Sequence, residues 1–408
     1  MRGTKSNRMK GENSQGPRLK PSTTRAHGLD TLRSLAIFSV IVFHVYAFHT
    51  EGTLPGYLVP AARMGWMGVD LFFVLSGYLI ASQLLRPYLA GERPGLWEFY
   101  RNRLYRVLPA YLVVLALYFT IPVWTEDPAL SPIWQFLTFT LNLFINYQVD
   151  QGFSHAWSLC VEEHFYLFLP LIVLAMMRKP SFRKTAALIG GLVIFGICLR
   201  SFILFHTLRP LAKAGQPWGL VYIERIYYPT YSRLDGLLAG VTLALIKNFR
   251  PRWWSAFAKR GHTLGCVGVC LVGVAIWLFK DRWVSVSGVS ALGTAVGFPV
   301  LSLGLGLLVA SALSTNGLLS RCKVPGAKLI ATLAYSLYLT HKELIHLVDL
   351  CFPALFKTGG GLWLGVYAAV CLLVAGVLYL CVERPFFVLR DRHRRGMASL
   401  EGAEKVRT

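Results

Sequence analysis

Charged residues are scarce in this 408-residue sequence, at 15% of the total, whereas hydrophobic residues make up 54%. Soluble globular proteins usually carry about 25% charged residues, so this composition argues against a water-soluble fold. Apolar runs recur along the whole sequence, and many approach or exceed the ~20 residues that a helix needs to cross a bilayer. The sequence therefore predicts an integral membrane protein.

Several other features are missing. The eight cysteines form no CxxC pair and lie mostly inside apolar runs, and histidines show no metal-ligand spacing. Zinc and dithiol motifs are thereby excluded, and the cysteines are expected to be small buried hydrophobes. No internal repeat occurs, and no inverted pair of interrupted helices of the kind that many secondary transporters contain.

Acidic residues are few, with 20 Asp and Glu against 42 Lys and Arg, which gives a formal net charge of +22. In a soluble protein this excess would suggest a nucleic-acid partner. Here the basic residues fall at the ends of apolar runs, where the positive-inside rule and anionic membrane lipids account for them. We therefore expect membrane lipids, and no nucleic acid, as partners.

The apolar runs predict an all-α polytopic membrane protein with about ten transmembrane helices plus one short re-entrant or buried segment. The predicted spans are 29–49, 66–86, 106–124, 157–177, 186–207, 230–247, 262–280, 287–313, 329–350 and 361–382. The short segment, 133–147, carries Asn142 and Asn146 and is not expected to cross. The loop containing Glu126 and Asp127 then lies outside, and all basic loops and both termini lie on the cytoplasmic side of the inner (plasma) membrane.

Three regions follow from the same reading. Residues 1–26 are basic, polar and rich in Gly, Ser and Pro, with no apolar core of their own, which predicts a disordered cytoplasmic tail and not a cleaved signal. Residues 27–392 form one transmembrane domain, and residues 393–408 a second cytoplasmic tail.

Arg33 and His44 lie within the first apolar run. An ionisable side chain inside a membrane span costs a few kcal/mol, so it usually has a partner or a function. At ~1.5 Å per residue the two positions are roughly 16 Å apart along a helix. They could line a path from the cytoplasmic face to the middle of the membrane.

Other ionisable residues fall in or beside the later spans. Arg101, Arg103 and Arg106 precede the third span, which predicts a cationic mouth on the cytoplasmic side. Deeper or on the outer side lie Asp70, Glu162, Glu163, His164, Arg233, Asp235, His341, Lys342 and Glu343. A carboxylate and histidine cluster is therefore expected above the arginines.

This division suggests group transfer across the membrane. Guanidinium groups bind phosphate oxygens in pairs, so the arginines suit a phosphorylated soluble donor such as an acyl-coenzyme A. A deeper histidine can act as general base toward a hydroxyl group, with a carboxylate to orient it. The acceptor would then approach His44 from the other face.

Five blocks in order resemble the membrane acyltransferase 3 family. They are residues 27–36 (HGLDTLRSLA) followed by His44, 68–79 (GVDLFFVLSGYL), 99–109 (FYRNRLYRVLP), 155–166 (HAWSLCVEEHFY) and 335–341 (YSLYLTH). In this resemblance Arg33 and His44 match the family's Arg-x10-His element, and Arg103 and Arg106 its Arg-x-x-Arg element. Two positions depart from it: His164 stands where many members have Gln, and Lys342 where Trp or an apolar residue is common.

The resemblance implies an enzyme, an O-acyltransferase that moves an acyl group, acetyl in the simplest case, from cytoplasmic acyl-CoA to a hydroxyl of a sugar, glycan or glycolipid acceptor in the cell envelope, such as lipopolysaccharide or another polysaccharide. Acyl-CoA is then a donor substrate, with no tightly bound cofactor and no metal. The predicted catalytic residues are His44, Arg33, Glu162 and Glu163. The predicted donor-binding residues are Arg33, Arg101, Arg103 and Arg106. The predicted acceptor-binding residues are Asp70, Arg233, Asp235, Tyr338 and His341.

Alternatives remain open at this point. A proton-coupled exporter could use His44, Glu162, Glu163 and His341 as a relay and the arginines to bind an anionic or glycosylated substrate. Glu162 or Glu163 could pair with Arg233 as a structural ion pair, Arg101 could only set topology, and His164 and His346 could be packing residues. His44 could also accept the acyl group itself as an acyl-imidazole. The sequence does not indicate an oligomeric state.

Overall fold

The computed structural model describes residues 27–48, 54–279, 290–358 and 360–394. These residues form helices, and their only β pairing is one bridge between Leu130 and Gly152. The all-helical prediction is confirmed. Both predicted tails lie outside the described residues, except that 393 and 394 continue the C-terminal helix.

Each predicted span overlaps a helix. The end of the span 262–280 and the start of the span 287–313 fall within residues 280–289, which lie outside the described part. The longer helices are α1 (His27–Phe48), α3 (Met67–Leu89), α4 (Leu96–Thr120), α7 (Trp157–Arg178), α8 (Phe182–Ile203), α11 (Asp235–Phe249), α13 (Gly261–Phe279), α14 (Phe298–Leu313), α16 (Ala327–Cys351) and α18 (Gly360–Leu378). Eight helical stretches in the described residues are long and apolar enough to cross a membrane. This makes the protein a multi-pass membrane protein.

The count of about ten spans is not confirmed, because α11 and α16 fall outside those eight. Helix α11 has only 15 residues, fewer than the ~20 that span a bilayer. Helix α16 has 25 residues but carries His341, Lys342 and Glu343 near its middle, which lowers its hydropathy. Both are nevertheless packed inside the helix bundle, where neighbouring helices replace lipid.

Short helices connect or extend the long ones. They are α2 (Val59–Arg63), α5 (Ile133–Leu137), α6 (Leu141–Phe144), α9 (Arg209–Lys213), α10 (Trp218–Tyr222), α12 (Pro251–Lys259), α15 (Leu318–Arg321) and α17 (Pro353–Thr358). Single-turn 3-10 helices are η1 (Gly56–Leu58), η2 (Pro122–Trp124), η3 (Ser154–Ala156) and η6 (Thr230–Ser232), and π-helical turns are η4 (Leu204–Leu208), η5 (Ile223–Tyr227), η8 (Gly293–Gly297) and η9 (Tyr379–Glu383). Segment 133–147 contains only α5 and α6, both far shorter than a membrane span, as expected of a segment that does not cross.

The start of α4 differs from the prediction. The span was expected at 106–124, after a basic loop, but the helix already begins at Leu96. Arg101, Arg103 and Arg106 therefore project from a helix. The hydropathy signal placed the boundary too late because charged residues can extend a helix beyond the apolar core of the bilayer, where their side chains reach the interface.

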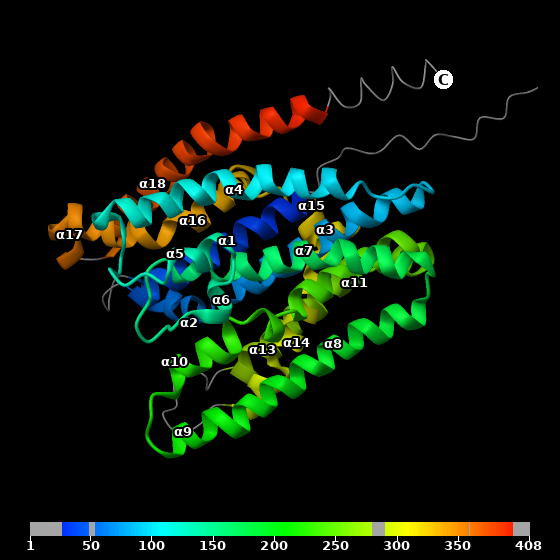
Figure 1. Cartoon of the computed structure of the whole chain (residues 1–408), viewed down its shortest axis with the longest axis horizontal. Coiled ribbons are helices and arrows are strands. Elements are labelled where there is room, and N and C mark those ends of the chain that lie inside the picture. The colour runs from blue at the N-terminus through cyan, green and yellow to red at the C-terminus, as the bar shows by residue number, and fades with distance from the viewer. Residues whose placement is uncertain (1–26, 49–53, 280–289, 359, 395–408) are drawn as a thin grey trace, which may run out of the picture.

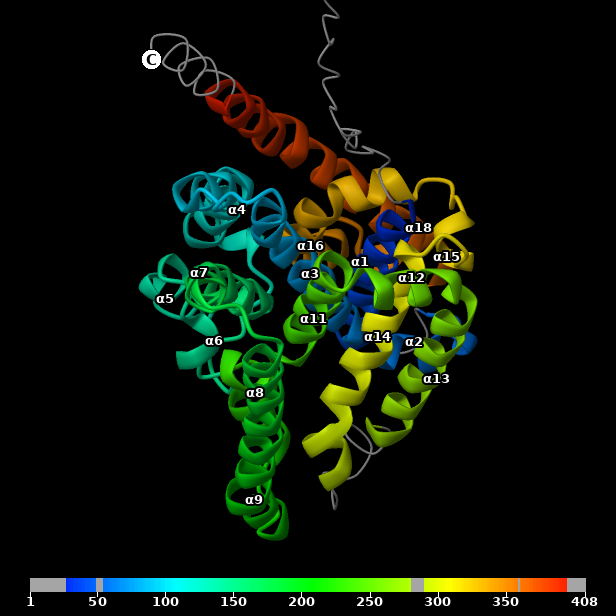
Figure 2. The ribbon, with the colours of Figure 1, turned by 90° about the vertical axis from the view of Figure 1, so that its right-hand side faces the viewer.

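Helices α1, α3 and α16 occupy the middle of the molecule (Figures 1 and 2). Helices α3 and α11 approach each other very closely. A Cβ added at Gly77 would lie 2.2 Å from the carbonyl oxygen of Leu237, and one added at Gly240 would lie 2.2 Å from that of Val74. Only glycine allows the two backbones to touch in this way, which is how small residues pack helices in membranes.

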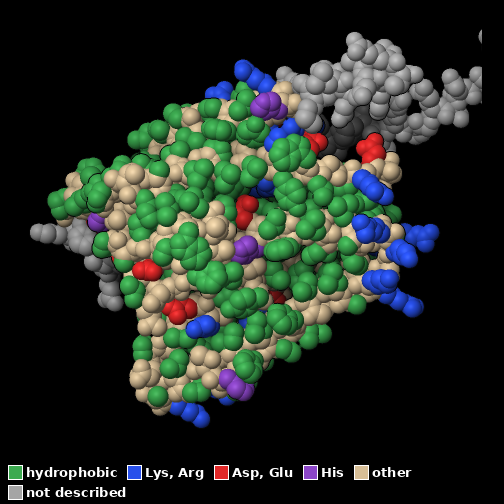
Figure 3. All heavy atoms as spheres, in the orientation of Figure 1, with side chains coloured by type: hydrophobic (Ala, Val, Ile, Leu, Met, Phe, Trp, Pro, Cys, Tyr) green, Lys and Arg blue, Asp and Glu red, His purple; other side chains and the backbone are tan. Residues whose placement is uncertain are grey.

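The surface matches a membrane protein. On the face in Figure 3, hydrophobic side chains are spread over the whole surface, and many Lys and Arg side chains gather at the right-hand edge. Figure 1 places the α3–α4 and α7–α8 connections at that edge, and Arg178, Arg183 and Lys184 of the second connection are exposed. Two of the predicted cytoplasmic loops therefore lie at the same end of the bundle.

Candidate functional site

A cavity of about 480 Å³ opens among α1, α3, α4, α7 and α16. Three of the predicted donor-binding arginines, Arg33, Arg103 and Arg106, line it. Arg101 lies on the same helix as two of them but is not part of the lining. The volume is within the range of small-molecule sites. Three carboxylates, Glu162, Glu163 and Glu383, line the cavity together with these arginines.

Glu162 and Glu163 line the same cavity. Glu162 accepts hydrogen bonds from Ser76 Oγ at 2.9 Å and from Tyr166 OH at 2.5 Å. The guanidinium carbon of Arg103 lies 4.7 Å from the centre of the Tyr166 ring, so Tyr166 contacts both a carboxylate and a cation. The two glutamates thus accompany the arginines, whereas the sequence had placed them in a separate layer with the histidines.

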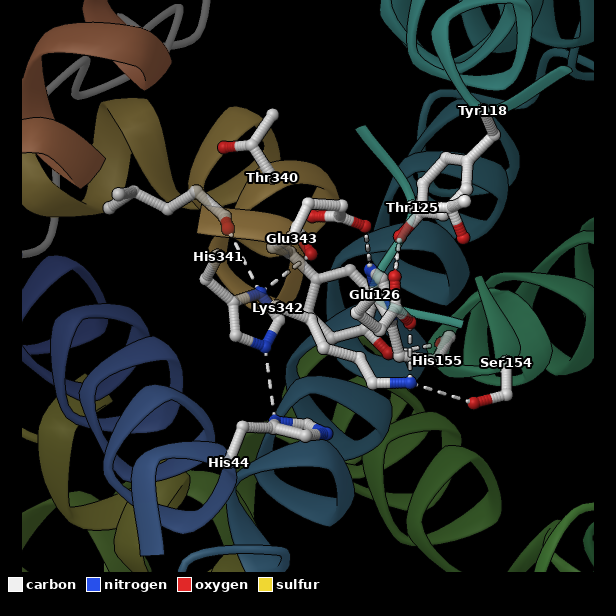
Figure 4. A network of polar contacts seen from close by, with 12 residues as sticks. His44, Tyr118, Thr125, Glu126, Ser154, His155, Thr340, His341, Lys342 and Glu343 are labelled. Atoms are coloured by element: carbon white, nitrogen blue, oxygen red, sulfur yellow. Dashed lines mark hydrogen bonds and ion pairs between the residues drawn. The ribbon is translucent and has the colours of Figure 1, made fainter. Parts of the chain in front are cut away.

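Toward the other end of α1, His44 meets His341 of α16. Their Nδ1 and Nε2 atoms, respectively, lie 3.0 Å apart (Figure 4). His341 has no solvent exposure, and its Nδ1 lies 2.8 Å from the carbonyl oxygen of Tyr338 and 3.1 Å from that of Leu337. The prediction that these two histidines act in one site is consistent with this contact.

The partners of His341 indicate which ring nitrogens carry hydrogen. Carbonyl oxygens only accept, so Nδ1 of His341 is the donor, and Nε2 of the neutral ring is the acceptor. His44 must then donate from Nδ1 to His341, and Val40 O at 3.0 Å from the same nitrogen requires the same hydrogen. Nε2 of His44 is left with its lone pair, which is the form that a general base needs.

A second pair of ionisable groups lies beside the histidines. The Nε2 atom of His155, in η3, lies 3.7 Å from Oε1 of Glu343. The side chain of His155 is 3% exposed and that of Glu343 is 0% exposed. The His155 ring centre is 5.3 Å from that of His341 and 6.3 Å from that of His44. His155 was not predicted as a site residue, because it precedes the apolar run that marks the span, although it opens the block 155–166.

Tyr338 separates the cavity from the histidines. Its side chain lines the cavity, and its OH group lies 2.5 Å from Ser158 Oγ and 2.7 Å from the carbonyl oxygen of His155. Since Tyr338 precedes His341 by one helical turn, the two face the same side of α16. The cavity and the histidine pair are therefore neighbouring compartments with this tyrosine between them.

Three of the predicted acceptor-binding residues lie elsewhere. Arg233 pairs with Asp70 at 2.9 Å, and its guanidinium carbon lies 4.1 Å from the ring centre of Phe298. Asp235 pairs with Arg200 at 2.8 Å. These side chains are almost completely buried and do not line the cavity. The alternative of a structural pair between Arg233 and Glu162 or Glu163 is wrong, because Arg233 binds Asp70 instead.

Two further histidines have ordinary surroundings. His164 Nδ1 lies 2.7 Å from Thr230 Oγ1, so it links α7 to η6. His346 lies half-buried on α16. Among the described residues, no three His, Cys, Asp or Glu side chains come together in a way that could hold a metal ion.

The fold and site define a multi-pass helical membrane protein in which a cavity lined by arginines and glutamates lies next to a pair of histidines in contact. A family model described as an acyltransferase domain matches residues 26–382, so the chain belongs to the acyltransferase 3 family. The resemblance drawn from the five sequence blocks is thereby confirmed.

Two relatives from Staphylococcus aureus are similar over much of the chain. O-acetyltransferase OatA (strain NCTC 8325 / PS 47) is 27% identical over 348 residues, which are 79% of this chain and 51% of the relative. A putative O-acetyltransferase of strain COL is 26% identical over 389 residues, which are 88% of this chain and 57% of that protein. The chain thus spans about half the length of the curated relatives it matches. No solved structure matches it significantly.

Proposed function

We propose that this protein is an integral membrane O-acyltransferase that transfers an acyl group from acyl-CoA to a hydroxyl group of a carbohydrate or glycolipid acceptor. Acetyl is the acyl group to test first, because the relatives are named O-acetyltransferases. The observation that carries the proposal is the contact between His341 and His44 beside a cavity lined by arginines.

In the proposed reaction the donor enters the cavity from the side where α4 begins. Arg33, Arg103 and Arg106 hold its phosphate groups by charge-assisted hydrogen bonds. Glu162 and Glu163 remain part of the proposed catalytic site. Glu162 binds Tyr166, and the Tyr166 ring in turn orients Arg103. The thioester then faces Tyr338, behind which His44 and His341 lie.

His44 acts as general base in the transfer. Its Nε2 atom takes the proton of the acceptor hydroxyl as the hydroxyl oxygen attacks the thioester carbonyl, and the carbon–sulfur bond breaks. The leaving thiolate takes the same proton back from His44, so that the products are an ester and the free thiol of CoA. His341 orients His44 and disperses the charge of its protonated ring.

The test uses membranes or purified protein with labelled acetyl-CoA. We expect label to enter a glycan or glycolipid fraction with release of an equal amount of CoA thiol. His44→Gln keeps a polar side chain without basicity and should lower turnover by about 10²–10⁴-fold while inserting normally. Turnover of His44→Gln within a few-fold of the wild-type protein would show that His44 is structural.

Two alternatives are outcomes of the same assay. Labelled acyl group trapped on the protein without acceptor, and lost in His44→Gln, would indicate an acyl-imidazole intermediate. Transport of a solute without thiol release would indicate the exporter instead.

A further inference from the structure

The ammonium group of Lys342 lies next to the histidine pair and binds the connection between α4 and α7. It is 2.6 Å from Glu126 Oε1, 3.2 Å from the carbonyl oxygen of Gln151 and 3.2 Å from Ser154 Oγ (Figure 4). The ammonium group thus donates hydrogen bonds to Gln151 and Ser154 and forms an ion pair with Glu126. Lys342 is therefore fully engaged and is not available to bind a substrate.

The acceptors come from both ends of one segment, residues 121–153, and from the residue that follows it. Glu126 is near its beginning, Gln151 is near its end, and Ser154 is the residue that follows it. The second carboxylate oxygen of Glu126 accepts a hydrogen bond from Tyr118 OH at 3.0 Å, which extends the network to α4. One side chain of α16 thus closes the segment into a loop.

This network is in contact with the proposed reaction centre. Lys342 follows His341 directly in α16, and Ser154 precedes His155. The Lys342 ammonium nitrogen lies 4.8 Å from the ring centre of Phe48, and the Phe48 ring stacks on His44 with centres 5.8 Å apart. A shift of the segment would therefore change the position of His44 through Lys342 and Phe48.

The backbone conformation at the end of the segment also indicates that the segment is held in place. Phe153 has φ 51°, a left-handed conformation that a bulky residue adopts only under constraint. Its ring is fully buried and stacks on Tyr118 with centres 4.3 Å apart. The end of the segment is thus held by packing on one side and by Lys342 on the other.

We infer that Lys342 and Glu126 are positioning residues for the acceptor step, a role that rests on the proposed acyl transfer. They fix residues 121–153 as a cover beside His44 and His341 on the side opposite the arginine cavity. The cover favours a correctly placed acceptor hydroxyl over water. Lys342 acts through the segment and does not touch the reacting atoms.

The test compares Lys342→Met and Glu126→Ala, singly and together, in purified protein with acetyl-CoA and the acceptor fraction. We expect Glu126→Ala to lower the ratio of acetyl transferred to acetyl hydrolysed by about ten-fold, equivalent to one lost charged contact, and Lys342→Met to lower it by at least as much, with the donor KM unchanged in both. Because Lys342→Met already breaks the ion pair with Glu126, the double variant should be no worse than Lys342→Met alone. Lys328→Met, an exposed lysine at the start of the same helix, is the matched control.

Hydrogen exchange supplies a measurement that needs no activity. Backbone amides in 121–153 should exchange faster in Lys342→Met than in the wild-type protein and in Lys328→Met. If Lys342→Met does not fold, Glu126→Ala carries the test, since Lys342 then keeps its other two acceptors. Unchanged exchange, an unchanged transfer ratio or additive single effects would each overturn the inference. Absence of any acetyl-CoA use by the wild-type protein would overturn the proposed function. Hydrogen exchange would still show whether Lys342 holds residues 121–153 in place.

Discussion

His44 donates from Nδ1 to Nε2 of His341 across 3.0 Å, although 297 positions separate them in the sequence. The carbonyl oxygens of Leu337 and Tyr338 fix the orientation of the acceptor ring. A histidine held in this way can hold a second histidine in one tautomer, a role that a carboxylate fills in many hydrolases. The pair gives His44 the free nitrogen that a base requires.

The first prediction concerns this contact. His341→Ala should lower kcat by about five-fold or more, since one hydrogen bond contributes on the order of 1 kcal/mol and the tautomer of His44 is no longer fixed. The donor KM should stay near the wild-type value, because His341 does not line the cavity. His341→Gln offers a carbonyl oxygen to His44 and should recover part of the loss. A kcat equal to that of the wild-type protein in His341→Ala would separate His341 from the chemistry.

The second prediction concerns the arginines of the cavity. Arg103→Ala and Arg106→Ala should each raise the apparent KM for acyl-CoA by about ten-fold or more, because a charged hydrogen bond to phosphate contributes roughly 1.5–3 kcal/mol. Protein abundance should stay near normal. Arg178→Ala, an exposed arginine at the end of α7, removes a charge at the same end of the bundle and serves as control. Equal donor dependence in all three variants would mean that these arginines only set topology.

The third prediction concerns topology. From the charge distribution we predict that the loop 125–132 lies outside and the loop 178–184 inside, with α5 and α6 not crossing. In a cysteine-free background, a membrane-impermeant thiol reagent should label Pro128→Cys from the outside and Lys184→Cys only after the membrane is opened. Both positions are exposed. Labelling of both from the same side of intact membranes would contradict the arrangement.

The fold could be predicted from the sequence wherever the residues of one segment alone determine whether that segment forms a membrane helix. Long apolar runs predicted nearly every long helix, because crossing a bilayer imposes a length and a composition on each helix separately. The start of α4 at Leu96 was missed because hydropathy detects the apolar core and not the helix that extends beyond it. Whether α11 counts as a membrane-spanning helix depends on the helices packed around it and not on its own residues.

The site was partly predictable for the same reason. The spacing of Arg33 and His44 within one helix, and of Arg103 and Arg106 within another, is visible in the sequence. Which carboxylate approaches which histidine depends on how separate helices face one another. Glu343 rather than Glu162 therefore lies near the histidines, and Lys342 binds Glu126 far away in the sequence. Tertiary pairings of this kind leave no local pattern.

The last prediction separates a structural role from substrate binding at Asp70 and Arg233. The ion pair has side chains only 4% and 1% exposed, and the rings of Phe298, Tyr227 and Trp157 surround the guanidinium group. Asp70→Asn would leave that cation buried without its carboxylate, which typically costs about 3–5 kcal/mol. We therefore expect a clear fall in the thermal unfolding temperature and in the amount of protein recovered.

The exposed pair Arg390–Asp391 provides the control, since its atoms are also 2.9 Å apart but its side chains are 28% and 51% exposed. Asp391→Asn should change the unfolding temperature little, because water solvates both groups. If Asp70 instead binds the acceptor, Asp70→Asn will keep the wild-type unfolding temperature and raise the acceptor KM. That result would restore Asp70 and Arg233 to the substrate site and would require the acceptor to reach them past Trp157 and Phe298.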